Sequence, residues 1–183
     1  MSQMDGFTLS PDTPRRLRLG LRGLTPDGAV EPLGSEVLDL APREQRAISA
    51  TALMGRWRDL ANAWQFGPPA FSALGATLDD AESGARLSDS THFPGGPALL
   101  RREAGLTARL RCDAGAWMLN VSARGFAQFV QLDDDAFIPA DSHFHLWPGE
   151  SRSVTLRGPC AAAPSGTISA LNAFAAAHYG VAE

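Results

Sequence analysis

The stretch FAQFVQLDDDAFIPADSHFHLWPGESRSVTLR, residues 126–157, decides the expected fold. The residues that share one side of its first extended run are Phe126, Gln128, Val130 and Leu132. Beyond the Pro148-Gly149 turn, Val154 and Leu156 share one side of a second run. Alternation with a period of two on both sides of a turn is typical of strands in a half-buried antiparallel sheet. The stretch therefore predicts architecture, and none of its residues is arranged to make or break a bond.

Similar alternation recurs along the rest of the chain. It is clearest in residues 15–22, where Leu17, Leu19 and Leu21 alternate with polar residues and predict a strand with one wet face. The other expected strands are residues 72–78, 85–93, 106–112, 117–121 and 167–171, with a hairpin made of 37–40 and 45–50. We expect one short helix within residues 51–62, and a frayed helix or an unstructured end over 173–183.

The breaker cluster Pro94-Gly95-Gly96-Pro97 marks the expected domain boundary. We predict an all-β fold of two tandem immunoglobulin-like β-sandwich domains, over residues 1–96 and 97–183, because short strands and turns follow at regular intervals. The first domain carries the short helical insertion.

Two segments carry a resemblance to a known family. Residues 141–156, DSHFHLWPGESRSVTL, resemble the end of the last immunoglobulin-like domain of bacterial β-mannosidases in glycoside hydrolase family 2. The residues that match the family's pattern are Phe144, Leu146, Pro148, Gly149, Val154 and Thr155. His143 and His145 stand where the family more often has an aromatic residue and an acid. Residues 53–69, LMGRWRDLANAWQFGPP, are similar to the family's linker into the last strands of its penultimate sandwich domain. If the first domain corresponds to that penultimate domain, the resemblance implies that its opening strands are missing, which would expose a sheet edge and favour a dimer through it.

The resemblance implies a non-catalytic accessory and support region of a β-mannosidase-like protein. The family hydrolyses terminal β-D-mannosides with retention, using a pair of glutamates held in a (β/α)8 barrel, and nothing in this sequence resembles that barrel. Glycoside hydrolysis usually needs two carboxyl groups flanking the bond on a rigid scaffold. The implied partner is therefore a (β/α)8 catalytic domain, in the same chain or in a partner chain, and we expect no catalytic residue and no cofactor here.

Aromatic residues supply an alternative function. Trp64 and Phe66 precede a Gly-Pro-Pro turn, and Trp147 precedes Pro148-Gly149. Exposed flat rings stack on sugar faces, so a free-standing carbohydrate-binding or adhesion module for mannose-containing glycans would use Trp64, Phe66 and Trp147. The commoner use of such rings is to pack one domain on another, and we favour that interpretation. A non-enzymatic partner that completes a split enzyme in trans is a third hypothesis.

Side chains that can hold metals occur without the spacing of a metal motif. Asp141, His143 and His145 would share one face of a strand and could present ligands to zinc. Asp133-Asp134-Asp135 offers oxygen ligands of the kind that calcium prefers. Neither group has the accompanying pattern of a known site. We therefore expect polar residues at the edge of a sandwich and a solvated turn, and no metal.

Composition and charge limit the possible partners of the protein and bear on its cellular compartment. A net charge of −4 and a pI near 5.5 disfavour a nucleic-acid partner. No apolar run reaches the roughly 18 residues that a membrane helix needs, and the first residues lack a secretory pattern. The compartment stays open between cytoplasm and periplasm or secretion with a parent enzyme. Cys112 and Cys160 would pair only in an oxidising compartment, and two reduced, half-buried thiols are the favoured interpretation.

Overall fold

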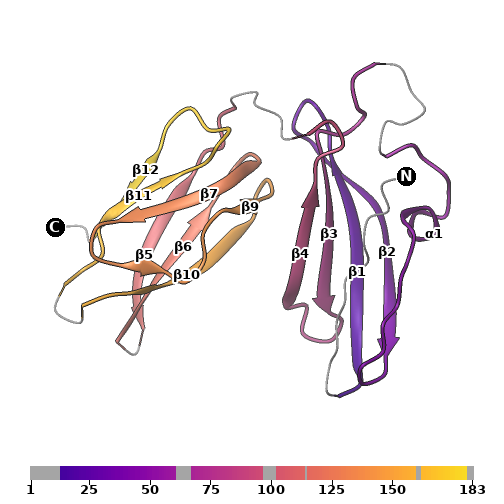
Figure 1. The fold of residues 1–183 in the computed structure, drawn as a ribbon, viewed down its shortest axis with the longest axis horizontal. Coiled ribbons are helices and arrows are strands. Elements are labelled where there is room, and N and C mark those ends of the chain that lie inside the picture. The colour runs from indigo at the N-terminus through magenta and orange to yellow at the C-terminus, as the bar shows by residue number, and fades with distance from the viewer. Residues whose placement is uncertain (1–12, 61–66, 97–101, 114, 160–161, 181–183) are drawn as a thin grey trace. The chain divides into compact units, whose positions relative to one another are not determined.

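The computed structural model describes residues 13–60, 67–96, 102–113, 115–159 and 162–180. Over these residues the fold is all-β with one short helix, as the sequence predicts. The chain divides into two compact units, Met1–Ala98 and Leu99–Glu183 (Figure 1). The helix lies in the first unit, and strands form the framework of both.

Unit 1 is built on an antiparallel sheet with the strand order β2-β1-β3-β4. Its strands are β1 (Arg15–Leu24), β2 (Val30–Leu40), β3 (Ala73–Asp80) and β4 (Arg86–His92). The leucines that alternate along β1 point to one face, where buried Leu17 packs with Leu40 of β2 and Leu78 of β3. The turn between β1 and β2 closes with a hydrogen bond of 2.9 Å from the Gly28 N–H to the Thr25 carbonyl.

The short helix α1 (Ala50–Met54) packs against β2. Ser49 caps its N-terminus, since the Ser49 hydroxyl accepts a hydrogen bond of 3.2 Å from the Ala52 N–H. Gly55 ends it in the left-handed conformation, with φ of 66°. The close approach of α1 to β2 depends on Gly34 of β2, because a Cβ atom at that position would lie 2.3 Å from the Leu53 carbonyl oxygen.

The expected hairpin of residues 37–40 with 45–50 is wrong. β2 begins earlier, at Val30, and pairs along its length with β1, while residues 45–49 form no strand. The first half of β2 contains Pro32 and Gly34, which weaken the sequence signal of a strand. Pro32 is tolerated because β2 is an edge strand, where one side of the backbone needs no partner.

Within its described residues, unit 1 contributes one sheet, whereas a β-sandwich has two. β2 and β4 are the two edges of this sheet. Several large apolar side chains of unit 1 are partly exposed, among them Val30 and Val37 of β2 and Leu87 of β4. The described part of unit 1 therefore corresponds to one of the two layers of a sandwich.

Unit 2 is a β-sandwich of two four-stranded sheets. One sheet, in the order β5-β6-β10-β8, contains β5 (Thr107–Asp113), β6 (Ala116–Ser122), β10 (Ser151–Arg157) and β8 (Ile138–Pro139). The other, in the order β12-β11-β7-β9, contains β12 (Ala177–Tyr179), β11 (Gly166–Ser169), β7 (Ala127–Asp134) and β9 (Phe144–Leu146). The first, second and sixth strands of the unit share one sheet and the third, seventh and eighth share the other, which is the immunoglobulin arrangement.

The core of unit 2 is filled from both sheets. Leu119 and Val121 of β6, Val130 of β7 and Ile168 of β11 are fully buried in one continuous apolar cluster. The residues that alternate with them along β6 are polar or partly exposed. This is the alternation that the sequence predicts for strands with one buried face.

Two expectations for unit 2 need correction. The runs before and after the Pro148-Gly149 turn do not share a sheet: β7 pairs with β9 and β11, while β10 pairs with β6 and β8. The chain therefore crosses from one sheet to the other at this turn, a connection that periodicity along one segment cannot reveal. The region after residue 172 is not a helix, because β12 (Ala177–Tyr179) pairs with β11.

Candidate functional site

The most irregular backbone of unit 2 lies where β7 meets β9. Ala127 pairs with Leu146 and Val130 pairs with Phe144, so β7 carries one residue more than β9 between these pairs. The extra residue is accommodated by Phe129, whose φ is 49°. A β-bulge of this kind redirects side chains and is common next to functional sites. We call the segment 126–130 of β7 and its flank the β7 bulge.

The bulge corrects the expected facing of residues 126–132. Val130 and Leu132 point into the core as predicted, but Ala127 takes the inward position that the alternation assigned to Phe126 and Gln128. Gln128 is buried, at 2% exposure, yet its side-chain Nε2 has no hydrogen-bond partner. A single extra residue moves every preceding side chain to the opposite face, since the side-chain period of a strand is two.

Asn172 holds the β7 bulge in place. Its side-chain Oδ1 accepts a hydrogen bond of 2.8 Å from the Gln128 N–H, and its Nδ2 donates one of 2.8 Å to the Phe126 carbonyl. The Gln128 carbonyl in turn accepts a hydrogen bond of 2.7 Å from the Leu171 N–H. Asn172 is itself buried, so these contacts replace the ladder hydrogen bonds that the bulge removes.

His145 of β9 lies against two aromatic rings of the β7 bulge. Its ring stacks on Phe126 with centroids 5.9 Å apart and meets Phe129 edge-on at 4.6 Å. Its Nδ1 accepts a hydrogen bond of 3.1 Å from the Phe129 N–H, which supports the left-handed conformation there. The Phe129 ring remains 38% exposed. An apolar ring and an imidazole thus stand together at the edge of the sheet.

The structure describes one of the three aromatic residues that the carbohydrate-binding hypothesis assigns to sugar stacking. Trp64 and Phe66 lie outside the described residues. Trp147 is buried, at 1% exposure, and packs edge-on against Phe126 with centroids 5.5 Å apart. Its ring cannot offer a face to a ligand, so Trp147 belongs to the support beneath the bulge. The exposed ring of this region is Phe129, which the alternation pattern did not single out.

Asp141, His143 and His145 do not converge on one point in the way that a metal site requires. Asp141 forms an ion pair of 3.2 Å with Arg152, whose guanidinium lies 4.8 Å over the Phe144 ring. His143 adopts a left-handed conformation, with φ of 64°, and its N–H donates to the Val130 carbonyl at 2.7 Å. No group of three or more His, Cys, Asp or Glu side chains that could hold a metal occurs among the described residues.

Of the acidic triplet 133–135, Asp133 and Asp134 end strand β7, and only Asp135 lies in the turn that was expected for all three. The Asp134 carboxylate accepts hydrogen bonds from the N–H groups of Ala136 and Phe137, at 3.0 and 2.9 Å. It also accepts one of 3.1 Å from the Tyr179 hydroxyl of β12. Burial, together with the negative charge of Asp134 and Asp133, raises the pKa of the Tyr179 phenol above its ordinary range. Asp134 therefore holds the turn that follows β7 and fastens β12 to the end of that strand.

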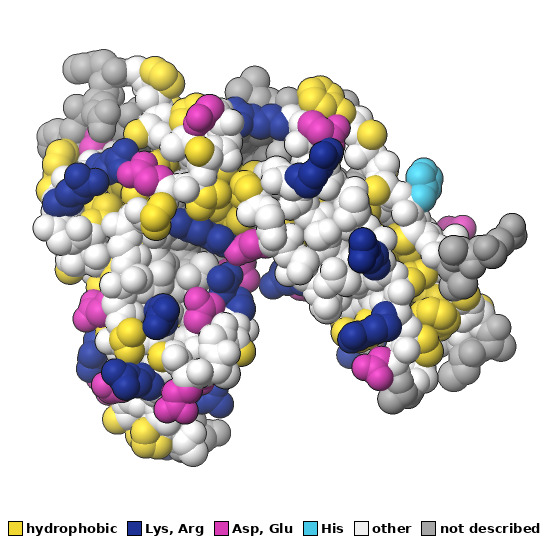
Figure 2. All heavy atoms as spheres, turned by 180° about the vertical axis from the view of Figure 1, so that it is seen from behind, with side chains coloured by type: hydrophobic (Ala, Val, Ile, Leu, Met, Phe, Trp, Pro, Cys, Tyr) yellow, Lys and Arg dark blue, Asp and Glu magenta, His cyan; other side chains and the backbone are white. Residues whose placement is uncertain are grey.

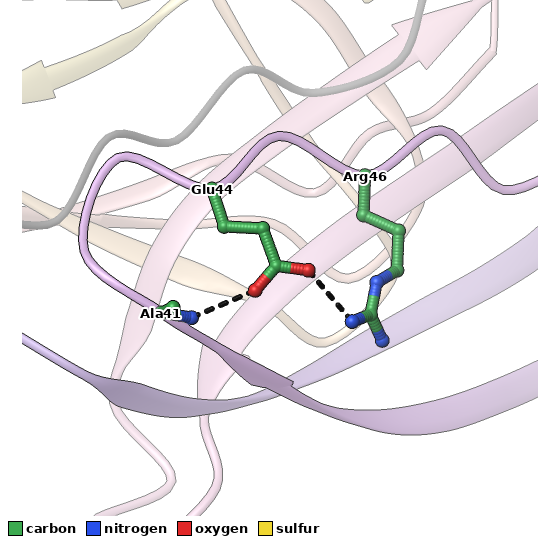
Figure 3. A network of polar contacts seen from close by, with 3 residues as sticks. All are labelled: Ala41, Glu44 and Arg46. Atoms are coloured by element: carbon green, nitrogen blue, oxygen red, sulfur yellow. Dashed lines mark hydrogen bonds and ion pairs between the residues drawn. The ribbon is translucent and has the colours of Figure 1, made fainter.

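Other acids of the chain also hold turns. The Glu44 carboxylate accepts from the Ala41 N–H at 2.8 Å and from Arg46 at 2.7 Å (Figure 3). These two bonds lower the pKa of Glu44, the first of them most. The Asp80 carboxylate accepts from the N–H and the hydroxyl of Ser83, both at 2.8 Å, and these bonds lower the pKa of Asp80. Each carboxylate stabilises the backbone of its own turn.

Two further expectations concern the cysteines and a membrane helix. Cys112 is a free and exposed cysteine of β5, and Cys160 lies outside the described residues. No helix in the described part of the chain is long and apolar enough to cross a membrane.

No protein-family model matches the sequence, and no curated protein matches it. The resemblance to β-mannosidases therefore rests on the two quoted segments alone.

Proposed function

We propose that this chain is a non-catalytic support region, of the kind that the C-terminal immunoglobulin-like domains supply in β-mannosidases of glycoside hydrolase family 2. On this proposal the chain stabilises or positions a catalytic (β/α)8 domain that hydrolyses terminal β-D-mannosides. The catalytic carboxylates then belong to that domain. The proposal rests on the resemblance of residues 53–69 and 141–156 to that family and on the exposed apolar side chains of the chain.

The observation that carries the proposal is the exposure of large apolar side chains. Trp57 of unit 1, whose described residues hold a single sheet, is 66% exposed. In unit 2, Ile138, Leu171 and Phe174 are each more than half exposed. Exposed apolar side chains of this size are candidates for a surface that another domain covers.

The roles of the acids support the same proposal. Asp134, Asp80 and Glu44 are each engaged by backbone N–H groups of their own turns. Asp141 is paired with Arg152 across the unit's own surface. A glycosidase needs two carboxyl groups facing a bound sugar across an open cleft. Carboxylates that serve as turn acceptors suit a support region better than a catalytic one.

The first experiment assays hydrolysis. The purified chain is incubated with a nitrophenyl β-D-mannoside, with a protein-free blank and an intact family 2 β-mannosidase as positive control. We expect no release of nitrophenol above the blank. Release that grows with protein concentration, and survives a second purification step, would refute the proposal.

A second experiment tests support directly. A β-mannosidase that has lost its C-terminal sandwich domains is mixed with this chain, and association is measured by analytical ultracentrifugation. We expect binding that weakens about tenfold or more when Trp57 is replaced by Ser. A large aromatic ring that becomes buried on binding commonly contributes most of the affinity of an interface. Gln131→Ser, a change at an exposed polar residue of β7, serves as the matched control. Absence of association, or equal loss with both variants, would contradict the support role.

A carbohydrate-binding module is the second candidate, and the exposed Phe129 ring favours it. The ring stands at the sheet edge beside His145, with centroids 4.6 Å apart, and its exposed part could stack on a sugar. Titration with manno-oligosaccharides, followed by tryptophan fluorescence, tests this candidate because Trp147 lies beneath Phe126 in the same cluster. Phe129→Ala should abolish a response that Phe174→Ala, at another exposed ring, leaves intact. A silent titration would exclude this candidate.

A further inference from the structure

His145 lies opposite the two residues that form the β7 bulge. Between the two pairs of the β7–β9 ladder, Gln128 and Phe129 of β7 face His145 of β9. In the sheet that the structure describes, β9 is an edge strand and β7 is its neighbour. The contacts of His145 therefore bear directly on how this edge is held.

The two backbone N–H groups of the bulge use acceptors of different kinds. The Gln128 N–H donates to the Asn172 Oδ1 at 2.8 Å, and the Phe129 N–H donates to the His145 Nδ1 at 3.1 Å. The amide oxygen of asparagine accepts at every pH, because that side chain does not titrate. An imidazole nitrogen accepts only while the ring is neutral. One anchor of the bulge is therefore permanent, and the other depends on pH.

Protonation of His145 removes the acceptor of the Phe129 N–H. Because Nδ1 accepts in the structure, the hydrogen of the neutral ring is on Nε2. A second proton places an N–H on Nδ1, directed at the N–H of Phe129, and two donors form no hydrogen bond. Histidine ordinarily changes its charge between about pH 5 and 8. The hydrogen bond is therefore lost in mildly acidic solution.

The stacking contact of His145 does not oppose protonation. The imidazole lies on the Phe126 ring with centroids 5.9 Å apart and 19° between the planes. A cation within about 6 Å of the face of an aromatic ring is attracted to it. The charged imidazole can keep this partner while it gives up the Phe129 N–H.

The charged groups around β9 are engaged elsewhere. Segments 126–132 of β7 and 166–174, which covers β11 and the turn after it, contain no titratable residue. Asp141 and Arg152 pair with each other at 3.2 Å, and the Glu150 carboxylate accepts from the Trp147 N–H at 3.3 Å. Acidic and basic side chains are interspersed over the face of the molecule in Figure 2, so no patch of one sign dominates there.

The remaining titratable groups of β7 and β9 lie on either side of this contact. They are Asp133 and Asp134 at the far end of β7, and His143 just before β9. The N–H of His143 donates to the Val130 carbonyl, a bond that does not involve its imidazole. The charge of His145 is therefore the one that acts on the Phe129 N–H through a hydrogen bond.

We propose that His145 is a pH-sensitive latch on the β7 bulge. The neutral ring holds Phe129 in the left-handed conformation, with φ of 49°, which a residue other than glycine rarely adopts. The protonated ring releases the Phe129 backbone, and the partly exposed Phe129 ring then changes its position at the sheet edge. The inference goes beyond the support role and does not depend on it.

Amide hydrogen exchange of the full chain, measured by NMR, tests the proposal. The protection of each amide is compared at about pH 7.5 and about pH 5, on either side of the ordinary histidine range, after correction for the intrinsic exchange rate. We expect the protection of the Phe129 N–H to fall about tenfold at the lower pH, as for the loss of one ordinary hydrogen bond. The fall should follow the titration of the His145 ring protons. The Gln128 N–H, bonded to Asn172, should keep its protection.

Variants assign the pH dependence to one ring. His145→Asn supplies an amide oxygen that does not titrate, so the Phe129 N–H should stay protected at both pH values. His145→Phe keeps a flat ring but removes the acceptor, and should give low protection at both. His143→Asn is the matched control, since asparagine tolerates the left-handed conformation at that position. This control should show the same pH dependence as the parent.

Four outcomes would overturn the proposal. They are unchanged protection of Phe129 between the two pH values, an equal fall at Gln128, a pH dependence that survives in His145→Asn, and a pH dependence that disappears in His143→Asn. Circular dichroism at both pH values confirms that each protein is folded. If neither variant at position 145 folds, the parent chain and His143→Asn decide the question, because the fall at Phe129 must still follow the His145 ring protons.

Discussion

The side-chain oxygen of Asn172 accepts a hydrogen bond of 2.8 Å from the backbone N–H of Gln128, 44 residues earlier in the chain. Together with the bond from its amide to the Phe126 carbonyl, this contact ties the turn after β11 to the bulge of β7. One side chain thus satisfies a donor and an acceptor that the sheet leaves unpaired. The geometry of the β7–β9 edge depends on it.

Replacing Asn172 by Ala should destabilise the protein by about 1–3 kcal/mol, because a buried backbone donor and a carbonyl lose their partners. Urea unfolding followed by tryptophan fluorescence measures the change. Asn120→Ala, at an exposed residue of β6, is the control and should stay within about 0.5 kcal/mol of the parent. Equal effects of the two changes would show that Asn172 does not hold the bulge.

Gln128→Met should leave the free energy of unfolding unchanged or raise it by up to about 1 kcal/mol. The buried Nε2 of Gln128 has no partner, and an apolar side chain of similar shape removes an unsatisfied donor. The same change at Gln131, an exposed residue of β7, gives the reference for a substitution without burial. A loss of more than about 1 kcal/mol at Gln128 alone would mean that its amide is satisfied in solution.

His143→Gly should stabilise the protein by about 0.5–1 kcal/mol. A left-handed conformation costs an ordinary residue about 1–2 kcal/mol, and glycine removes this cost. The greater conformational freedom of glycine in the unfolded chain cancels part of that stabilisation. Ser142→Gly, at the preceding residue, should instead destabilise, since no strain is relieved there. Thermal unfolding of both variants measures the difference. Destabilisation by His143→Gly would show that its imidazole makes a contact worth more than the strain.

The tyrosine of this chain should ionise only at alkaline pH beyond its ordinary range. Tyr179 is the sole tyrosine, so the ultraviolet absorbance of tyrosinate reports on it alone. Burial and the charge of Asp134 raise its pKa, and unfolding in denaturant should return the midpoint to about 10. Because the folded pKa is the higher one, this group's contribution to stability is full below about pH 10 and falls as pH rises above it.

Asp134→Asn separates the causes of that shift. The amide oxygen still accepts from the turn, but the negative charge next to the phenol is gone, so the native midpoint of Tyr179 should move down. Asp141→Asn removes a carboxylate that is paired with Arg152 instead and should leave the midpoint in place. An unchanged midpoint in Asp134→Asn would assign the raised pKa of Tyr179 to burial and to the charge of Asp133.

The sequence predicts strands well where one face is buried and the pattern is regular. Leu17, Leu19 and Leu21 alternate with polar residues, and β1 forms there as expected. Which strands pair is harder to predict, since the 28 residues 123–150 separate β6 from its partner β10 and no local pattern encodes that choice. Only the turn and breaker residues indicate where the chain can change sheets.

The candidate site was less predictable than the fold. Phe129 becomes exposed because one extra residue in β7 shifts the alternation, and a bulge without glycine leaves no signal in the sequence. Trp147 precedes a Pro-Gly turn, so an exposed stacking ring was the alternative to the favoured packing role, and the structure buries the ring. Asn172 follows a strand, where asparagine commonly ends up in turns, and this is the one sequence signal that pointed to it.

The crossing at Pro148-Gly149 bears on how unit 2 reaches its native state. Because β7 and β9 lie in one sheet and β8 and β10 in the other, neither sheet can be completed from one contiguous stretch of chain. Assembly must wait for pairings between distant strands, a topology of high contact order that slows folding. It also couples the two layers, so that the sandwich gains or loses its order as a single cooperative unit.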